Sequence, residues 1–391
     1  MVRTSLAVPL LLFVAPLFCM IGLLGAPIAG AAQSAVRAAA VPPIASKFWL
    51  LLSYQARQVI ASRGADERVE PASLTKLMSA YLVFGALRQK QLTLDQTLPV
   101  SAKAWKMVGS RMFIEPNRPV TADELLHGMI VQSGNDAAIA LAEGVAGSEE
   151  AFVQRMNDQA TRLGLAHTKF ANATGLSDPH QYSTVNELAQ LAVALIRDFP
   201  EYFPLYSIKD YTYNRITQRN RNDLLFRDPY VDGIKTGYIE SAGYCLIATA
   251  QREGRRLLAV VMGAASESTR AIEAQNLLNY GFQYYETLKL YPNGATVVEI
   301  PVWKGSEKRL KAGFTEDLFV MVPKGQRDLL KIKLESMQPL IAPISAQQTV
   351  GMLHVTFDDK PYGDYPVVAL EPVGMANMFG RGWDSLRLWF Q

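Results

Sequence analysis

A serine and a lysine three positions apart, Ser73 and Lys76, could together carry out nucleophilic chemistry. Because positions i and i+3 lie on the same face of a helix, this spacing would place a hydroxyl beside an amine. A serine hydroxyl is a poor nucleophile until a base removes its proton, and a lysine can be that base when burial and nearby positive charge lower its pKa. At a helix start, the backbone N–H of Ser73 would also be free to stabilise an oxyanion. The alternative is an exposed helix start with an ordinary surface lysine.

A second motif, Ser133-Gly134-Asn135, begins 60 residues after Ser73 and interrupts a helical pattern. Serine, glycine and asparagine are common turn residues, so the simplest interpretation is an ordinary turn. In the functional interpretation, the Ser133 hydroxyl relays a proton, and the Asn135 amide holds both the substrate carbonyl and Lys76.

A third motif, Lys235-Thr236-Gly237, lies on a predicted strand and is followed by Tyr238. Lys235 would bind a carboxylate and help to keep Lys76 neutral, and Thr236 would donate a hydrogen bond to the same carboxylate. Gly237 would let the backbone approach the substrate closely, and the N–H of Tyr238 would be a second oxyanion donor. The alternative is a glycine-containing strand with an exposed lysine.

The patterns around these motifs predict an α/β domain over residues 44–292. Apolar runs predict two strands over 48–62 and a hairpin of central strands at 244–250 and 257–262. Apolar residues at helical spacing predict a helix that begins near Ser73 and further helices at 122–131, 137–145, 149–163, 185–197 and 270–289. The three motifs would then lie at a helix start, in a loop between helices and on a strand.

The residues from 293 to 375 predict a second, smaller domain built only of strands. Short β-rich segments recur between turns, at 296–302, 318–322, 329–334, 349–357 and 367–370. The expected fold class is therefore an α/β (α+β) domain followed by a small all-β sandwich or barrel.

The two ends of the chain carry patterns of their own. Arg3, an apolar run and several small residues predict a secretory signal peptide over 1–31, with residue 40 as a later cleavage option and an uncleaved membrane anchor as the alternative. Residues 376–391 predict an amphipathic helix with an aromatic face, which would bind a membrane lipid surface. The alternative is a terminal helix docked on the β domain.

Composition narrows the function classes. A chain of 391 residues with 49% hydrophobic and 19% charged residues can form a sizeable core, which argues against a disordered protein. A net charge of +3 does not suggest nucleic-acid binding. With four histidines, two cysteines and no HExxH or CxxC spacing, we expect neither a metal site nor a cofactor. Cys19 lies in the predicted signal, so Cys245 is expected to be a lone buried thiol.

The three motifs occur in the order SxxK, SxN, KTG, each in the structural context that its chemistry needs. On these residues the chain resembles the low-molecular-mass penicillin-binding proteins, specifically the D-alanyl-D-alanine carboxypeptidases of the penicillin-binding protein 5 type. The resemblance covers nearly the whole mature chain and includes segments 70–76, 132–136, 220–225, 231–237 and 281–287. The chain departs from the family pattern at Ile239, where the family often has threonine, and in the turn 53–57, which lacks the usual Asp and Gly.

The resemblance implies a penicillin-recognising serine hydrolase fold, in which a five-stranded antiparallel sheet lies between helical layers and a small β domain follows. It implies a serine carboxypeptidase that removes the terminal D-alanine from peptidoglycan stem pentapeptides through an acyl-enzyme, and that β-lactam antibiotics acylate. It places such a protein at the periplasmic face of the bacterial inner membrane, as a peripheral protein. The site residues that it implies are Ser73 as nucleophile, Lys76 as base, Ser133, Asn135 and Lys235 as their partners, Arg221 near the substrate carboxylate, and Arg270 near the active-site end of the sheet.

Two other functions remain as alternatives at this point. A class A β-lactamase shares the three motifs but needs an additional glutamate a few dozen residues after SxN, and segments 164–168 and 172–176 supply none. His180, nearby, is interpreted as structural. A non-catalytic cell-wall-binding scaffold would not need all three motifs intact.

Overall fold

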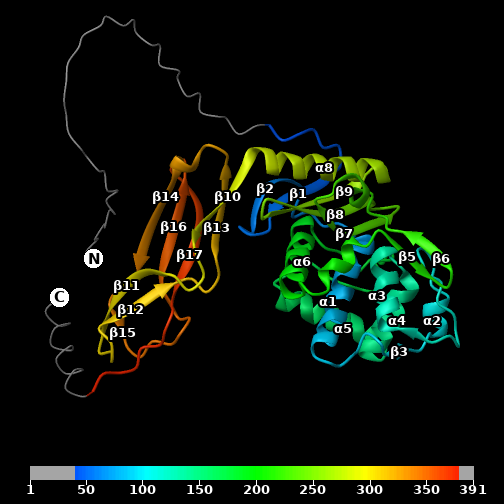
Figure 1. The fold of residues 1–391 in the computed structure, drawn as a ribbon, viewed down its shortest axis with the longest axis horizontal. Helices are drawn as coiled ribbons and strands as arrows, with labels where there is room; N and C mark the ends of the chain where they lie inside the picture. Colours follow the sequence, from blue (N-terminus) through cyan, green and yellow to red (C-terminus); the bar gives the residue numbers. More distant parts are fainter. Residues whose placement is uncertain (1–39, 378–391) are drawn as a thin grey trace, which may run out of the picture. The chain divides into compact units, whose positions relative to one another are not determined.

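The computed structural model describes residues 40–377 (Figure 1). The predicted signal peptide, and the predicted amphipathic helix beyond residue 377, lie outside the described residues. The described part contains the expected domain of helices around a sheet and the expected β-rich domain, which confirms the predicted fold class.

A five-stranded antiparallel sheet forms the centre of the first domain, in the order β2-β1-β9-β8-β7. Its strands are β1 (Phe48–Ser53), β2 (Gln58–Arg63), β7 (Val231–Ile239), β8 (Gly243–Arg252) and β9 (Arg255–Ala264). Successive side chains of a strand point to opposite faces. In β1, Leu50 and Leu52 therefore join one apolar core, and Trp49 and Leu51 join the core on the other face. Because both of their faces are buried, β1, β8 and β9 are rich in apolar residues over most of their length.

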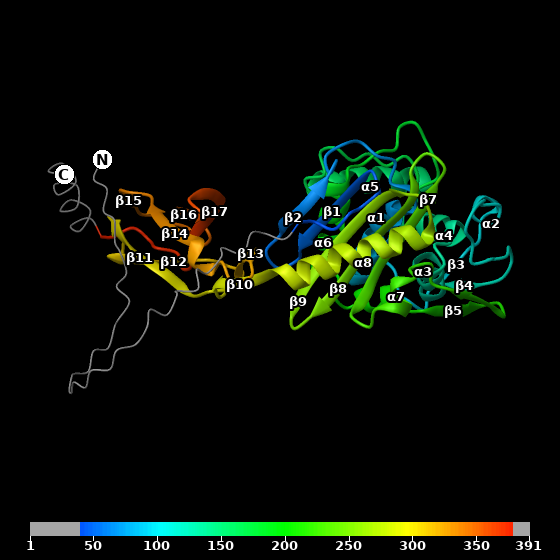
Figure 2. The same ribbon diagram turned by 90° about the horizontal axis from the view of Figure 1, so that it is seen from above.

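One long helix, α8 (Glu267–Tyr284), covers one face of the sheet and contacts β8 and β9 (Figure 2). The side chain of Ser266 caps its first turn by accepting a hydrogen bond from the backbone N–H of Thr269. The prediction of a helix over 270–289 is wrong at its end, because residues 285–289 belong to strand β10 (Tyr285–Tyr291). This strand pairs with β13 (Leu318–Pro323), a distant partner that local helical spacing cannot reveal.

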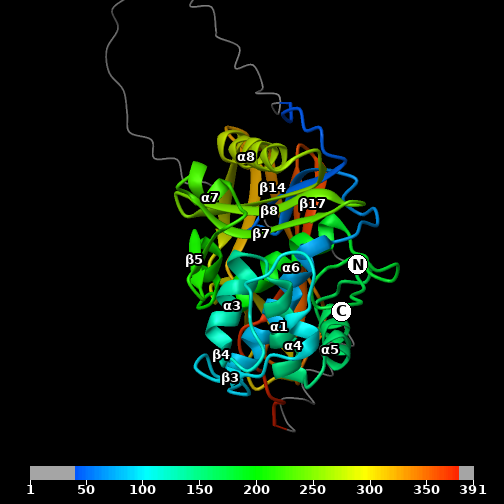
Figure 3. The same cartoon turned by 90° about the vertical axis from the view of Figure 1, so that its right-hand side faces the viewer.

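A layer of helices covers the other face of the sheet, so that the sheet lies between helical layers as expected (Figure 3). Its members are α1 (Lys76–Arg88), α3 (Ala122–Val131), α4 (Asn135–Ala146), α5 (Glu149–Arg162) and α6 (Val185–Asp198). Helix α1 is buried by the others, because it contacts α3, α4, α5 and α6. Side-chain caps define several of the starts, among them a capping box between Thr121 and Glu124 at α3.

Smaller elements complete this domain. They are η1 (Ala72–Thr75), β3 (Thr97–Leu98), α2 (Ala102–Trp105), β4 (Val120–Thr121), η2 (Phe203–Ser207), β5 (Asp210–Tyr213), β6 (Ile216–Arg219) and α7 (Leu224–Arg227). Strand β3 pairs with β4, and β5 pairs with β6.

The second domain is built of strands, as predicted, and has an apolar core of its own. Besides the β10–β13 pair it holds a six-stranded sheet in the order β14-β16-β17-β12-β11-β15. The strands of that sheet are β11 (Thr296–Trp303), β12 (Arg309–Gly313), β14 (Leu330–Ser336), β15 (Leu340–Ile341), β16 (Thr349–Phe357) and β17 (Lys360–Ala369), and a short turn η3 (Arg327–Leu329) precedes β14. The strand expected at 367–370 is the end of the longer β17, and β12 was not predicted, since it has few apolar residues.

Candidate active site

The three motifs meet at one cavity of about 300 Å³. Eight of the ten predicted site residues line this cavity: Ser73, Ser133, Asn135, Arg221, Thr236, Gly237, Tyr238 and Arg270. The other two, Lys76 and Lys235, are 2% and 3% exposed and hydrogen-bond to lining residues. We call this space the catalytic cavity.

Ser73 lies in the 3₁₀ turn η1, which leads directly into α1. The neighbouring Leu74 is fully buried and anchors the turn in the core. Ala72 adopts a left-handed conformation with φ of 48°, and Gly175 packs against its carbonyl group. A Cβ atom at position 175 would lie only 1.8 Å from the carbonyl oxygen of Ala72, so the close approach requires glycine there. The expected helix start near Ser73 is confirmed, and neighbouring segments hold it in place.

Lys76 has the surroundings that a neutral lysine needs. Its Nζ lies 3.1 Å from the Oγ of Ser73 and 2.7 Å from the Oδ1 of Asn135, and it also donates to the carbonyl oxygen of Thr174. Burial lowers the pKa of Lys76 to about 7; Asp136 opposes this shift, and Arg221 adds to it. Burial is therefore the main reason why the amine can lose its proton near neutral pH.

The serine–glycine–asparagine motif forms the expected break between α3 and α4. Ser133 has a φ of 64°, and α4 begins at Asn135. The Nδ2 of Asn135 donates to the carbonyl oxygen of Val108 over 2.7 Å, which leaves its Oδ1 directed at Lys76. The carboxylate of the next residue, Asp136, accepts hydrogen bonds from the backbone of Met112, Phe113 and Ile114. The motif therefore also holds the loop that forms one wall of the catalytic cavity.

The lysine–threonine–glycine motif lies on β7, the edge strand of the sheet. The Nζ of Lys235 donates to the Oγ of Ser133 over 2.7 Å. Its pKa is lowered well below the usual value by burial first, and then by the positive charges of Lys76, Arg221 and Arg270. A Cβ at Gly237 would lie 3.1 Å from the Cβ of Ala72 and 3.3 Å from the backbone N of Ser73. Gly237 therefore lies close against the turn of Ser73, and its expected close approach to the substrate stays a prediction.

Two arginines complete the positive side of the cavity. Arg221 is exposed and lines the cavity. Arg270 is 3% exposed, and its guanidinium donates to the carbonyl oxygens of Gly237 and Arg221, each over 3.2 Å. Arg270 therefore fixes the strand and the neighbouring arginine, a more specific role than the sequence suggested. The ring of Tyr238, which is 53% exposed, packs against the ring of Tyr244 at an interplanar angle of 36°, with ring centroids 4.4 Å apart.

Comparison with known proteins agrees with this geometry. Residues 35–266 match the family described as D-alanyl-D-alanine carboxypeptidase, and residues 285–374 match the C-terminal domain of penicillin-binding protein 5. The chain belongs to the D-alanyl-D-alanine carboxypeptidase family. It is accordingly an enzyme, a serine-type carboxypeptidase, as the motifs predicted.

Relatives of this carboxypeptidase cover nearly its whole length. It is 39% identical to the D-alanyl-D-alanine carboxypeptidase DacC of Escherichia coli K12 over 93% of this chain and 92% of that protein. It is 36% identical to DacA of the same strain over 90% of this chain and 89% of that protein. The crystal structure of penicillin-binding protein 5 from Haemophilus influenzae superposes with a TM-score of 0.82 at 36% identity, covering 86% of this chain and 99% of that one. The expected resemblance to penicillin-binding protein 5 is confirmed.

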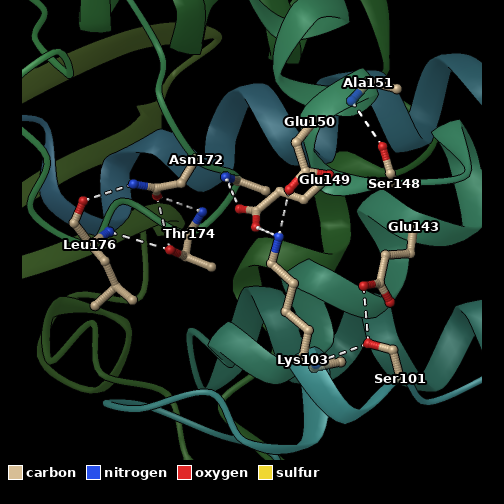
Figure 4. Close-up of polar contacts among 12 residues, drawn as sticks. Ser101, Lys103, Glu143, Ser148, Glu149, Glu150, Ala151, Asn172, Thr174 and Leu176 are labelled. Atoms are coloured by element: carbon tan, nitrogen blue, oxygen red, sulfur yellow. Dashed lines mark hydrogen bonds and ion pairs between the residues drawn. The ribbon is translucent and has the colours of Figure 1, made fainter.

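Sequence reasoning missed the turn that supplies the Thr174 carbonyl to Lys76 in this carboxypeptidase. The Oδ1 of Asn172 accepts hydrogen bonds from the backbone N–H groups of Thr174 and Gly175, at 3.1 and 2.7 Å (Figure 4). The spacing of Asn172 and Gly175 is typical of such side-chain-closed turns and could have indicated this one.

A mostly buried carboxylate, that of Glu149, supports the same turn (Figure 4). The Oε1 of Glu149, at the start of α5, accepts a hydrogen bond of 2.9 Å from the N–H of Ala173. The Oε2 of Glu149 lies 2.8 Å from the Nζ of Lys103, which also binds the exposed Glu150. No motif in the sequence marks Glu149, because its role depends on contacts between distant segments.

Two residues that the sequence analysis singled out, Cys245 and His180, do not line the catalytic cavity. Cys245 is a free, fully buried thiol whose pKa burial raises to about 11, which confirms that this cysteine is buried as expected. His180 is exposed and does not line the catalytic cavity. Among residues 40–377, no group of three or more His, Cys, Asp or Glu side chains is arranged to hold a metal ion.

Proposed function

We propose that this carboxypeptidase releases the terminal D-alanine of peptidoglycan stem pentapeptides through an acyl-enzyme formed on Ser73. The contact of 3.1 Å between the Ser73 hydroxyl and the buried amine of Lys76 carries this proposal. A lysine with a pKa of about 7 is partly neutral at physiological pH and can take the proton of the hydroxyl. The homologues named D-alanyl-D-alanine carboxypeptidase support the choice of substrate.

In the acylation step, Lys76 takes the Ser73 proton while the Oγ attacks the carbonyl carbon of the D-Ala–D-Ala peptide bond. The backbone N–H groups of Ser73 and Tyr238 stabilise the oxyanion. Thr236 and Arg221 bind the terminal carboxylate, since both line the catalytic cavity beside the attacking hydroxyl.

Departure of the leaving group requires a proton on the D-alanine nitrogen. Ser133 supplies it: its hydroxyl, which accepts a hydrogen bond from Lys235, passes its own proton to the nitrogen and receives in return the proton that Lys76 took from Ser73, so that Lys76 is neutral again. Water then hydrolyses the ester on Ser73 and regenerates the enzyme. A β-lactam ring presents a similar acyl group beside a carboxylate, so β-lactam antibiotics acylate the same serine.

We also propose that the protein is exported and works at the periplasmic face of the inner membrane. The pattern of residues 1–31 supports export, and the aromatic face of residues 376–391 supports peripheral attachment to lipid. No helix within residues 40–377 is long and apolar enough to cross a membrane.

The decisive experiment is intact mass spectrometry after incubation with benzylpenicillin, with peptide mapping of the adduct. We expect one penicilloyl group on Ser73, no adduct in Ser73→Ala, and release of free D-alanine from a pentapeptide by the wild type only. An adduct that survives in Ser73→Ala would refute the mechanism. Rapid turnover of benzylpenicillin without D-alanine release would indicate a β-lactamase, and absence of both reactions would indicate a scaffold.

A further inference from the structure

A second cavity, of about 410 Å³, is lined in part by residues that are close in the chain to residues of the catalytic cavity. One wall is Glu240, which directly follows Ile239 of the catalytic cavity in the chain. Another wall includes Glu70, three residues before Ser73. A substrate that reacts at Ser73 can therefore extend into this second space.

Four charged side chains of mixed sign line this second cavity: Lys47, Arg68, Glu70 and Glu240. We call it the charged pocket. Within residues 40–377, none of the four forms an ion pair. The guanidinium of Arg68 is instead held 4.0 Å from the ring centroid of Tyr182. One oxygen of Glu70 accepts a hydrogen bond of 2.7 Å from the hydroxyl of Ser177, a neutral partner. The charges of two cations and two anions are thus not neutralised by ion pairs and can bind a ligand that carries both charges.

Two glycines, which have no side chain, form part of the lining of the charged pocket. Gly243 and Gly263 line it and have φ angles of 65° and 78°. A Cβ at Gly243 would lie 3.1 Å from the Cα of Gly263, so the two strands touch there without side chains. The two glycines add no side chain to the lining, and the volume of about 410 Å³ can admit the end of a ligand side chain.

The fold also determines the direction in which a peptide can leave the catalytic cavity. On the N-terminal half of β7, a Cβ at Gly233 would meet Tyr206 of η2 at 3.2 Å, and the carbonyl oxygen of Gly233 already accepts from Asn222. A peptide that binds the free edge of β7 with its carboxylate at Thr236 must therefore run toward Glu240. The four steps along the chain from Thr236 to Glu240 span roughly 13 Å, about the length of two extended residues and one long side chain.

From this geometry we propose that the charged pocket is a subsite for a zwitterionic side chain. That side chain belongs to the residue before the two terminal D-alanines and ends in both an ammonium and a carboxylate, as a diaminopimelyl residue does. Arg68 and Lys47 bind the carboxylate, and Glu70 and Glu240 bind the ammonium. This inference rests on the proposed function, because it assumes a stem-peptide substrate.

The test compares three pentapeptides that differ only at the end of the diaminopimelyl side chain. One has the free zwitterion, the second has a carboxamide in place of the carboxylate, and the third has an acetylated amine. We expect the full-length enzyme to release D-alanine from the free form with a kcat/KM about fivefold higher than from either blocked form, the size typical of one partly exposed charge pair.

Single substitutions then test which residue of the charged pocket binds the carboxylate and which binds the ammonium. In Arg68→Gln the preference over the carboxamide should fall to about one, and in Glu240→Gln the preference over the acetylated form should fall. Arg88→Gln is the matched control, because Arg88 pairs with Glu201 at the end of α1, about 18 Å along the helix from Lys76. It should keep both preferences, and the benzylpenicillin adduct verifies that each variant is folded.

The outcomes separate the two proposals. Equal rates on all three peptides by the wild type would overturn the subsite and leave the carboxypeptidase activity intact. A preference that persists in both folded variants would overturn the assignment to these residues. No release of D-alanine from any peptide would refute the proposed function, and the subsite with it.

Discussion

The hydroxyl of Ser133 lies 2.7 Å from the amine of Lys235, although 102 residues separate the two in the chain. Ser133 holds a left-handed conformation with φ of 64°, and Lys235 is 3% exposed. A left-handed serine and a buried amine are both unfavourable by themselves. Their meeting at the catalytic cavity supports the proposed transfer of a proton through Ser133.

Replacing Ser133 by alanine should impair catalysis far more than stability. We expect kcat/KM for D-alanine release to fall about 10²- to 10⁴-fold, the usual contribution of a positioned acid or base. Ser110→Ala is the matched control, because its hydroxyl also lies at the cavity but donates to the carbonyl oxygen of Gln132. Equal losses in the two variants would contradict a proton-transfer role for Ser133.

The acylation rate should depend on pH through Lys76. Burial lowers the pKa of this amine to about 7, and only the neutral amine can accept the Ser73 proton. We therefore expect benzylpenicillin acylation to rise about tenfold per pH unit below pH 7 and to level off above it. Stopped-flow acylation between pH 5.5 and 8.5 measures this profile, and a flat profile would contradict the neutral-base role.

Lys76→Arg separates the charge of Lys76 from its basicity. The guanidinium keeps the positive charge but does not deprotonate at usable pH, because its pKa exceeds about 12. Acylation should fall by about three orders of magnitude in this variant and stay unchanged in the exposed control Lys90→Arg. Near-normal acylation by Lys76→Arg would exclude Lys76 as the base.

Glu149 and its neighbour Glu150 form a natural matched pair. Both carboxylates bind Lys103, but the side chain of Glu149 is 10% exposed and that of Glu150 is 75% exposed. Glu149→Ala leaves the buried N–H of Ala173 without an acceptor, so we expect a loss of about 1–3 kcal/mol in the free energy of unfolding. Acylation should also slow, because the turn at Thr174 holds Lys76.

Urea denaturation and acylation rates, measured on both variants, test this prediction. Glu150→Ala should leave the free energy of unfolding nearly unchanged, as is typical of exposed ion pairs. A Glu149→Ala protein as stable and as fast as Glu150→Ala would show that the turn does not need the buried carboxylate.

Removal of the C-terminal segment should release the protein from membranes. Truncation after Asn377 keeps the hydrogen bond from the backbone N of Ala376 to the carbonyl oxygen of Lys304, so the β domain retains its last described contacts. An interfacial helix binds reversibly through a few aromatic side chains, so we expect the truncated form in the soluble fraction with a normal penicillin adduct. A truncated protein that stays in the membrane pellet would indicate an uncleaved signal or another docking surface.

The contact between a nucleophile and a base, and the helices and strands that depend on local pattern, could be predicted from the sequence. The spacing of Ser73 and Lys76 predicted a hydroxyl beside an amine, and the structure places them 3.1 Å apart. Helix α3 matches its predicted bounds, since its apolar spacing and its capping box act within a few residues. Such features are readable because their causes lie close together in the chain.

The protonation behaviour of Lys76 and the supports of the site depend on contacts that only the folded structure shows. The pKa of Lys76 falls mainly because the surrounding structure buries it. The spacing of Ser73 and Lys76 does not predict this burial. The change from α8 to β10 depends on pairing with β13, and the support of Thr174 by Glu149 joins separate segments. These contacts arise only when distant parts of the chain pack together, since desolvation and strand pairing depend on neighbours in space rather than in sequence.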